Sequence, residues 1–129
     1  MGTAYLMDTN AAIDYLNGKL PASCVAAIDE NVIEISVITR IELLAWQGAT
    51  KAQLEVLNNF IGTCIVHHLD EPIILAAIEI RKTKKCKLPD AIIAATAIIM
   101  QLTLLTNNSF DFMNINSLAL DNPYQLSIV

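Results

Sequence analysis

Apolar positions along the chain follow two patterns. Short apolar runs, rich in β-branched residues, predict buried strands at residues 4–7, 32–37, 64–67, 103–106 and 118–120. Longer stretches with apolar residues at helical spacing predict helices at residues 11–16, 21–28, 39–46, 50–61, 72–82 and 90–100, with a helical turn at 109–112. Apolar strands separated by helices are typical of a parallel sheet covered on both faces. The sequence therefore predicts an α/β fold.

The same order of elements predicts where a site would lie. Connections between parallel strands are right-handed, so the carboxyl ends of the strands share one edge of the sheet. Ligands of such sheets bind outside that edge. Residues 90–100 are apolar on all sides, and a helix of this kind is buried against the sheet and a neighbouring helix.

Bulk composition fits one domain over residues 1–129. No apolar run reaches the ~18 residues of a membrane helix, and the start lacks the pattern of a signal peptide. We therefore expect a cytoplasmic protein without a membrane partner. The three cysteines form no C-x-x-C pair, which indicates reduced thiols. His67 and His68 have no obvious partner, and we expect them to be structural or exposed.

Three acidic residues stand where helices are predicted to begin. Asp8 follows the first strand, and Asp90 opens the apolar helix. Glu42 comes three residues after Thr39, in the T-x-x-E pattern of a capping box. Each acid taken singly is explained at least as well as a helix cap or turn residue.

Taken together, the three acids predict a metal site. All of them would reach the carboxyl edge of one sheet, where helix dipoles would lower their pKa values and keep them ionised. Clustered carboxylates repel each other, and their oxygens suit Mg²⁺ or Mn²⁺. A cation held in this way can activate water for phosphodiester cleavage. The constellation favours a metal-dependent hydrolase.

Positive charge is concentrated in one segment. The net charge is −5, yet residues 81–87 hold five of the eight Lys and Arg residues and no acid. Such a patch could bind an anion, for example a nucleic-acid backbone. It could equally be a solvated helix end whose cations favour the dipole.

At this point the residues show a resemblance. The ordered pieces YLMDTN, SVITRIELL, KLPDAIIAATA and LLTNNSFDF, spread over nearly the whole chain, resemble the motifs of PIN-domain ribonucleases, specifically VapC-type toxins of type II toxin–antitoxin systems. The resemblance implies a three-layer α/β/α sandwich with a central, mostly parallel sheet. It also implies an Mg²⁺- or Mn²⁺-dependent endoribonuclease toxin that cleaves RNA through metal-activated water.

The resemblance assigns roles to residues at matching positions. It implies that Asp8, Glu42 and Asp90 are catalytic and bind the metal. It places further polar side chains near the site as support, namely Thr9, Asn10, Thr39, Thr106 and Asn108.

One acid of the wider family pattern is replaced. Many PIN domains have Asp two residues after the threonine of the last motif, where this chain has Asn108 after Thr106. A neutral amide is a weaker ligand for a hard cation. Asp111 is then the nearby candidate for a fourth catalytic acid, and the number of metals stays open.

The resemblance also implies macromolecular partners. Because the basic segment leads directly to Asp90, we expect its cations to bind the RNA substrate: Arg81, Lys82, Lys84, Lys85 and Lys87. The resemblance further implies a cognate VapB-type antitoxin, received in a groove near Trp46 and the neighbouring apolar residues, and a homodimer.

Rival functions fit the sequence less well. A catalytically weak PIN fold that only binds a partner is kept open by Asn108. A receiver-type signalling domain needs an acidic pair after the first strand and a Lys after the last strands, and this chain has neither. A haloacid-dehalogenase-like phosphatase needs D-x-D, where this chain reads Asp8-Thr9-Asn10.

Overall fold

Five parallel strands form the central sheet of the structure, a computed structural model that describes residues 4–126. The strands are β1 (Tyr5–Met7), β2 (Glu34–Ser36), β3 (Ile65–His67), β4 (Thr103–Leu105) and β5 (Leu120–Asp121). Their order across the sheet is β3-β2-β1-β4-β5. The central strand β1 pairs on both sides, with Leu6 opposite Glu34 of β2 and Leu104 of β4. The expected parallel sheet is confirmed.

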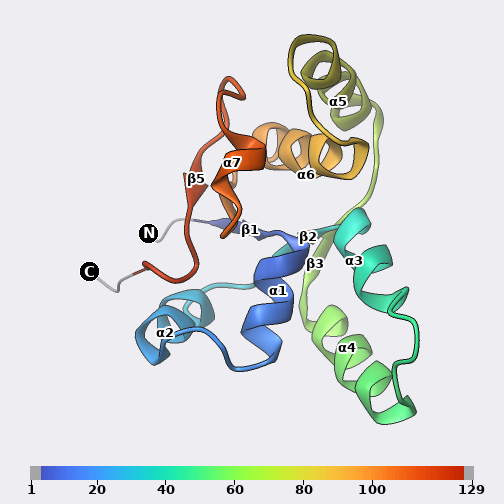
Figure 1. Cartoon of the computed structure of the whole chain (residues 1–129), viewed down its shortest axis with the longest axis vertical. Helices are drawn as coiled ribbons and strands as arrows, with labels where there is room; N and C mark the ends of the chain where they lie inside the picture. Colours follow the sequence, from blue (N-terminus) through green and yellow to red (C-terminus); the bar gives the residue numbers. More distant parts are fainter. Residues whose placement is uncertain (1–3, 127–129) are drawn as a thin grey trace.

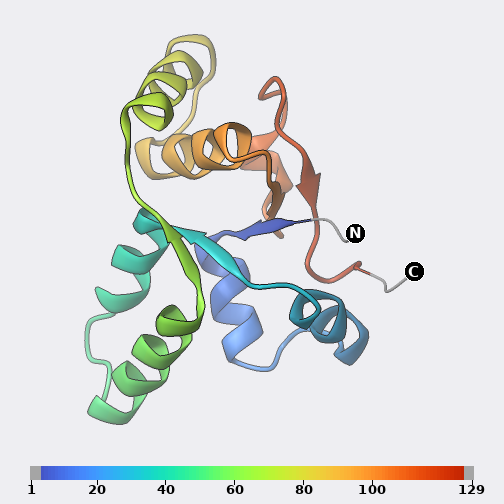
Figure 2. The same cartoon turned by 180° about the vertical axis from the view of Figure 1, so that it is seen from behind.

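Helices cover both faces of this sheet. They are α1 (Thr9–Leu16), α2 (Ala22–Asp29), α3 (Val37–Leu44), α4 (Lys51–Thr63), α5 (Glu71–Thr83), α6 (Leu88–Ile99) and α7 (Ser109–Phe112). Helices α1, α2 and α4 lie on one side of the strands, and α5 and α6 lie on the other (Figure 1). The view from behind gives the same division (Figure 2). The expected three-layer α/β/α arrangement is therefore confirmed.

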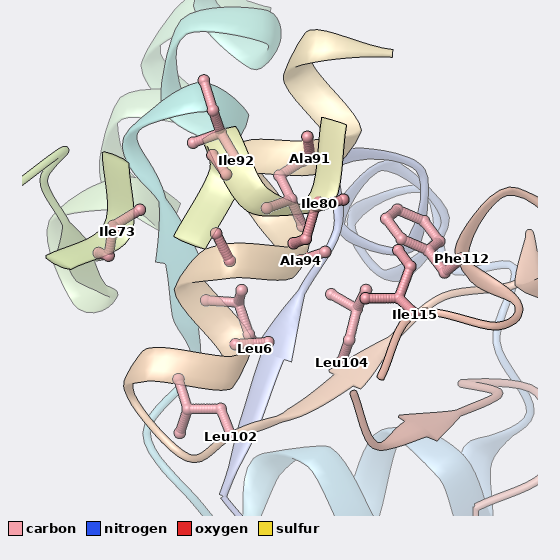
Figure 3. Close-up of a cluster of buried hydrophobic side chains, with 14 residues drawn as sticks. Leu6, Ile73, Ile80, Ala91, Ile92, Ala94, Leu102, Leu104, Phe112 and Ile115 are labelled. Atoms are coloured by element: carbon pink, nitrogen blue, oxygen red, sulfur yellow. The ribbon is translucent and has the colours of Figure 1, made fainter. Parts of the chain in front are cut away.

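Neighbouring residues of each central strand enter different cores, because successive side chains of a strand point to opposite faces. Leu6 and Leu104 belong to the core under α5, α6 and α7, and Figure 3 shows both lying beside the side chains of α6. Met7 and Leu105 belong to the core under α1, α2, α3 and α4. The middle of the sheet is thus buried on both faces, which is why neighbouring residues of β1 and of β4 are both apolar.

Helix α6 is the most deeply embedded helix. Every residue from Ala91 to Ala97 is buried, as its apolar sequence predicted. Its alanines let α5 and the sheet approach closely, and the hydroxyl of Thr96 is satisfied because it donates to the Ile92 carbonyl at 2.7 Å. Asp90 stands at the amino end of this rigidly packed element.

The starts of α1 and α3 differ from the sequence prediction. Asp8 itself caps α1, which begins at Thr9 rather than after it. Ser36 caps α3, so the helix starts at Val37; a capping box of Thr39 and Glu42 is therefore wrong. A capping box does occur one helix later, between Thr50 and Gln53.

The start of α6 also lies earlier than predicted. Lys87 occupies the N-cap position without a side-chain bond, and Asp90 lies in the first helical turn. The reason for such shifts is general, because a pattern of apolar residues determines the buried face of a helix better than it determines the first residue. Among the residues that the structure describes, none of the helices is long and apolar enough to cross a membrane.

Candidate metal and nucleic-acid site

Polar residues end the two central strands at the carboxyl edge of the sheet. Asp8 follows β1, and Thr106 follows β4, which pairs with β1. Strands β2 and β3 lie on one side of β1, and the chain then returns to place β4 on the other side. This reversal is the switch point at which open α/β sheets bind ligands. Both side chains are buried there, with Asp8 only 5% exposed.

The carboxylate of Asp8 is held in place by the start of α1. Its Oδ1 accepts a hydrogen bond from the backbone N–H of Ala11 at 2.8 Å. Burial raises the pKa of Asp8, and the carboxylates of Asp90 and Asp14 raise it further. Hydrogen bonds from Thr106 and from the Ala11 backbone oppose this effect. Asp8 is therefore a fixed acid whose negative charge is costly where it lies.

Glu42 reaches the site from the second turn of α3 rather than from a helix start. The hydroxyl of Thr9 donates to Glu42 Oε1 at 2.6 Å and lies 3.1 Å from the buried Thr39 hydroxyl. These bonds join the amino ends of α1 and α3. They direct the exposed Glu42 side chain to the pocket that it shares with Asp8. Glu42 therefore reaches the site although the sequence prediction placed it at the start of its helix.

Asp90 completes the group from the opposite layer. Burial raises the pKa of Asp90, the carboxylates of Asp111 and Glu42 raise it further, and the Lys87 ammonium lowers it. The expectation that helix dipoles lower the pKa values of these acids is thus wrong for Asp8 and Asp90. Desolvation and mutual repulsion outweigh the dipole where carboxylates gather in a partly buried edge.

The three acids line one small pocket of about 120 Å³. Its lining is Asp8, Thr9, Asn10, Glu42, Asp90 and Ile93. The sequence prediction that these acids meet at one edge with Thr9 and Asn10 beside them agrees with this geometry. Thr39 and Thr106 lie behind the pocket wall, where they bond to Thr9 and Asp8.

The chemistry of this pocket fits a divalent cation that keeps part of its water shell. Within residues 4–126, no three Asp, Glu, His or Cys side chains are arranged so that they alone could hold a metal ion. Mg²⁺ usually takes only one or two carboxylates from a protein and retains several waters. The crowding of Asp8 and Asp90 is a repulsion that a cation would relieve.

Asn108 and Asp111 form a pair beside this pocket. The Asn108 backbone N–H donates to the Thr106 hydroxyl at 2.9 Å, and its side-chain amide donates to Asp111 Oδ2 at 2.5 Å. The amide therefore orients Asp111, whose carboxylate raises the pKa of Asp90. Asp111 lines a larger cavity rather than the small pocket.

That larger cavity, of about 520 Å³, adjoins the small pocket through Asp90, which lines both. Three of the predicted RNA-binding lysines line it, namely Lys84, Lys85 and Lys87. Arg81 and Lys82 lie in the last turn of α5 and outside its lining. The structure thus brings part of the basic segment to the acidic edge.

An apolar groove adjoins the small pocket on the other side. It has a volume of about 370 Å³ and shares Glu42 with the acidic pocket. Its further lining is Ile13, Leu16, Asn17, Leu43, Trp46 and Leu57. Trp46 is 51% exposed there, so this ring is surface, whereas Leu54 is packed against the core.

No histidine or cysteine of the described residues lines the small acidic pocket. His67 Nε2 lies 2.7 Å from Glu34 Oε1 on the neighbouring strand, so it has the partner that the sequence did not reveal, while His68 is exposed. Cys24, Cys64 and Cys86 are free thiols. The expectation of structural or exposed histidines agrees with these positions.

Sequence reasoning missed the residues that form the far wall of the large cavity, among them Phe110, Met113 and Asn114. A single Phe-Asp-Phe run does not reveal which aromatic ring faces inward. The only available signal was that this run ends the last of the ordered motif pieces, LLTNNSFDF.

Known proteins provide an independent comparison. No curated protein matches the chain. A chain in a toxin–antitoxin complex from Klebsiella pneumoniae is 32% identical, with 95% of this chain and 100% of that chain covered and a TM-score of 0.77. A DNA-bound VapBC complex from Salmonella typhimurium contains a chain with 25% identity, coverage of 94% and 98%, and a TM-score of 0.82.

A VapBC2 complex from Rickettsia felis, bound to a DNA fragment from its promoter, contains a chain with 25% identity, coverage of 93% and 98%, and a TM-score of 0.79. The PIN domain family matches residues 5–112. The resemblance that the sequence motifs indicated, to PIN domains and to VapC-type toxins, is thereby confirmed, and the chain belongs to the PIN domain family.

Proposed function

We propose that this protein is the toxin of a toxin–antitoxin pair, an endoribonuclease that hydrolyses RNA phosphodiester bonds with Mg²⁺ or Mn²⁺. The observation that carries the proposal is the 120 Å³ pocket at the switch point of the sheet, lined by Asp8, Glu42 and Asp90. The similarity of the whole chain to chains of toxin–antitoxin complexes supports the same function.

Each acid has a separate task in this proposal. Asp8 and Asp90 are the direct metal ligands, because they are the two partly or fully buried carboxylates whose repulsion a cation relieves. Glu42, oriented by Thr9, would hold the cation together with them. Asp111, whose carboxylate is held by Asn108 in the neighbouring cavity, would add negative charge beside Asp90.

The cation would supply charge neutralisation at the scissile phosphate and a lowered pKa for the attacking water. The chain supplies position. The Ala11 N–H fixes Asp8, and the buried helix α6 fixes Asp90. Lys84, Lys85 and Lys87 are the cations that hold the RNA backbone at the adjoining cavity.

The antitoxin belongs on the other side of the pocket. An apolar groove with a half-exposed Trp46 ring suits an amphipathic helix of a VapB-type partner. A segment seated there would touch Glu42, which lines both the groove and the pocket, and so would block the site. We also propose that the toxin acts as a homodimer, in line with its family.

The test is RNA cleavage by the purified protein. We expect cleavage with Mg²⁺ or Mn²⁺, none in excess EDTA, and a loss of at least ~100-fold for Asp90→Asn, the scale on which single electrostatic groups act in active sites. Glu55→Gln, on the exposed face of α4, makes the same change in charge and should cleave normally. Full activity of Asp90→Asn would refute the assignment.

A second candidate is a PIN fold that binds RNA but cleaves it weakly. The specific observation in its favour is Asn108, which stands in the position of an acid and ties Asp111 through its amide. Metal-independent RNA binding without cleavage under any divalent cation would favour this alternative over the nuclease.

A further inference from the structure

The cavity beside the acidic pocket is large enough for a part of the substrate that the pocket cannot hold. The acidic pocket measures about 120 Å³ and the cavity about 520 Å³. Small-molecule sites usually measure ~300–1,000 Å³, so the cavity, unlike the acidic pocket, has room for a nucleoside. Asp90 lines both spaces. A phosphate at the acids therefore has its neighbouring nucleotide at the mouth of the cavity.

One wall of the cavity is cationic. Lys84, Lys85 and Lys87 line it, and in the part of the chain that is described, His67 and Glu34 form the only ion pair. The three ammonium groups are thus not neutralised by carboxylates within ion-pair distance. Their charge is available to a phosphate group.

An aromatic side chain also lines the cavity. Phe110 and Phe112 both lie on the short helix α7, but Phe112 is 3% exposed and packs in the core beside Leu104 and Ile115 (Figure 3). Phe110 is 81% exposed and lines the cavity. The buried ring anchors the helix, and this anchoring holds the exposed ring at the cavity's rim.

The segment after α7 adds one uncharged amide. Asn114 lines the cavity and has a φ of 65°, in the left-handed region that Asn tolerates better than most residues. Its side-chain amide has two N–H donors and one acceptor oxygen, and such an amide can form hydrogen bonds with the edge of a nucleobase.

We propose that this cavity is the subsite for a nucleotide next to the scissile phosphate. Phe110 stacks on its base, the Asn114 amide bonds to the base edge, and Lys84 and Lys85 bind its phosphate. This subsite rests on the proposed RNA-cleaving function. It would determine which base the protein prefers next to the cleaved bond. It adds Phe110 and Asn114 to the substrate-binding residues.

Other occupants fit the cavity less well. A free anion would explain the lysines but would leave the exposed aromatic ring without a role. An amphipathic helix of a protein partner needs an apolar groove, and such a groove lies at Trp46 on the other side of the acids. An aromatic ring beside a cationic track is the combination with which proteins bind single-stranded nucleic acid.

The test is a double-mutant cycle between the Phe110 ring and single bases of an RNA. Binding of a short single-stranded RNA is measured in EDTA, so that cleavage does not contribute, with a series in which each nucleotide in turn is abasic. We expect Phe110→Ala to weaken binding of the intact RNA by roughly tenfold, as for the loss of one base–aromatic stack. At one abasic position next to the cut, Phe110→Ala should cause no further loss.

Four further variants sharpen this test. Phe110→Trp should restore binding and Phe110→Leu should not, because only the former keeps a stacking surface. Val56→Ala, an exposed apolar residue on α4, should bind like the unmodified protein. Asn114→Gly, which accepts the positive φ without strain, should bind the preferred RNA more weakly and flatten the preference among bases at the coupled position.

The result that overturns the subsite is clear. If Phe110→Ala binds as tightly as the unmodified protein, or if no abasic position couples to Phe110, the ring does not contact a base. Cleavage with Mg²⁺ retained in that case would leave the proposed nuclease intact. Coupling in EDTA without cleavage under any metal would instead sustain the subsite and refute the nuclease.

Discussion

The two spaces that flank the acidic pocket differ in almost every property. The cavity on the Asp90 side carries Lys84, Lys85 and Lys87, whereas the groove on the Glu42 side is lined mainly by apolar side chains. Each flank shares one acid with the pocket between them. The difference teaches that one edge of one sheet presents two binding chemistries, each in direct contact with the same reactive centre.

Ligands of the two flanks would also contact different acids of the pocket. A ligand in the cationic cavity meets Asp90, which is fixed by the buried helix α6. A ligand in the apolar groove meets Glu42, an exposed side chain held by the Thr9 hydroxyl. Occupying the groove therefore disturbs the more adjustable acid, and occupying the cavity uses the more rigid one.

The largest effect is expected at the centre, where both flanks converge. Asp8→Asn should reduce RNA cleavage by at least ~100-fold, while RNA binding in EDTA and antitoxin binding stay unchanged. Asn also caps helices well, so the Ala11 bond survives. Loss of either binding activity in this variant would show that the flanks depend on the centre.

The same variant has a thermal signature whose sign follows from the raised pKa of Asp8. A raised pKa means that the folded protein binds more protons than the unfolded chain, so stability falls as pH rises through the interval from the unfolded value to the folded one. Without metal, Asp8→Asn should lack this loss and melt above the unmodified protein at neutral pH. Melting curves at pH 3 to 8 check this, since equal curves would contradict it.

The apolar flank is tested by Trp46→Ala. A half-exposed ring at the centre of a groove is a typical hot spot, and its removal should weaken antitoxin binding by ~30-fold or more, corresponding to ~2 kcal/mol. RNA cleavage by the free toxin should be unaffected. Isothermal titration with the cognate antitoxin and a cleavage assay measure the two properties. Impaired cleavage would mean that the flanks are not separable.

A smaller effect is expected from the bond that orients Glu42. Thr9→Val removes the hydroxyl that donates at 2.6 Å and keeps the side-chain volume. Mg²⁺ affinity should fall by about tenfold, the lower end of what outer-shell partners contribute. Mg²⁺ titration monitored by thermal shift measures this. Thr103→Val, on β4 away from the acids, is the matched control, and an equal loss there would contradict the role of Thr9.

The smallest effect is expected on the cationic flank. Changing Lys84 and Lys85 together to Gln should lower the dependence of log K for RNA on log salt by about 1.4, or ~0.7 for each lost phosphate contact on a single strand. Lys19 and Lys51, both exposed and outside the cavity lining, give the control with the same change in charge. An identical salt slope in the two double variants would exclude a specific RNA track.

Much of the fold followed from the sequence because its apolar runs are buried on both faces. Continuous apolar strands such as residues 4–7 are typical of a covered parallel sheet. The helix starts were harder. Thr39 and Glu42 match a capping box, yet Ser36 supplies an earlier cap, and a short motif cannot reveal which of two caps the chain uses.

The sequence predicted which acids line the candidate site, but it did not predict their pKa values. Asp8, Glu42 and Asp90 line one pocket as expected, since the topology brings them to one edge. The raised pKa values of Asp8 and Asp90 depend on burial and on separations between layers, which the sequence does not encode locally. The opposite orientations of Phe110 and Phe112 depend on the same tertiary packing.

Strand β1 restricts changes in the length of the chain. Leu6 enters one core, Met7 enters the other and Asp8 caps α1 at the site, so three consecutive residues serve three different surroundings. A residue inserted between Leu6 and Asp8 would exchange the two faces of the strand and displace the acid at once. Insertions and deletions should be tolerated at surface turns such as Gly48, while this tripeptide admits substitutions but no change in length.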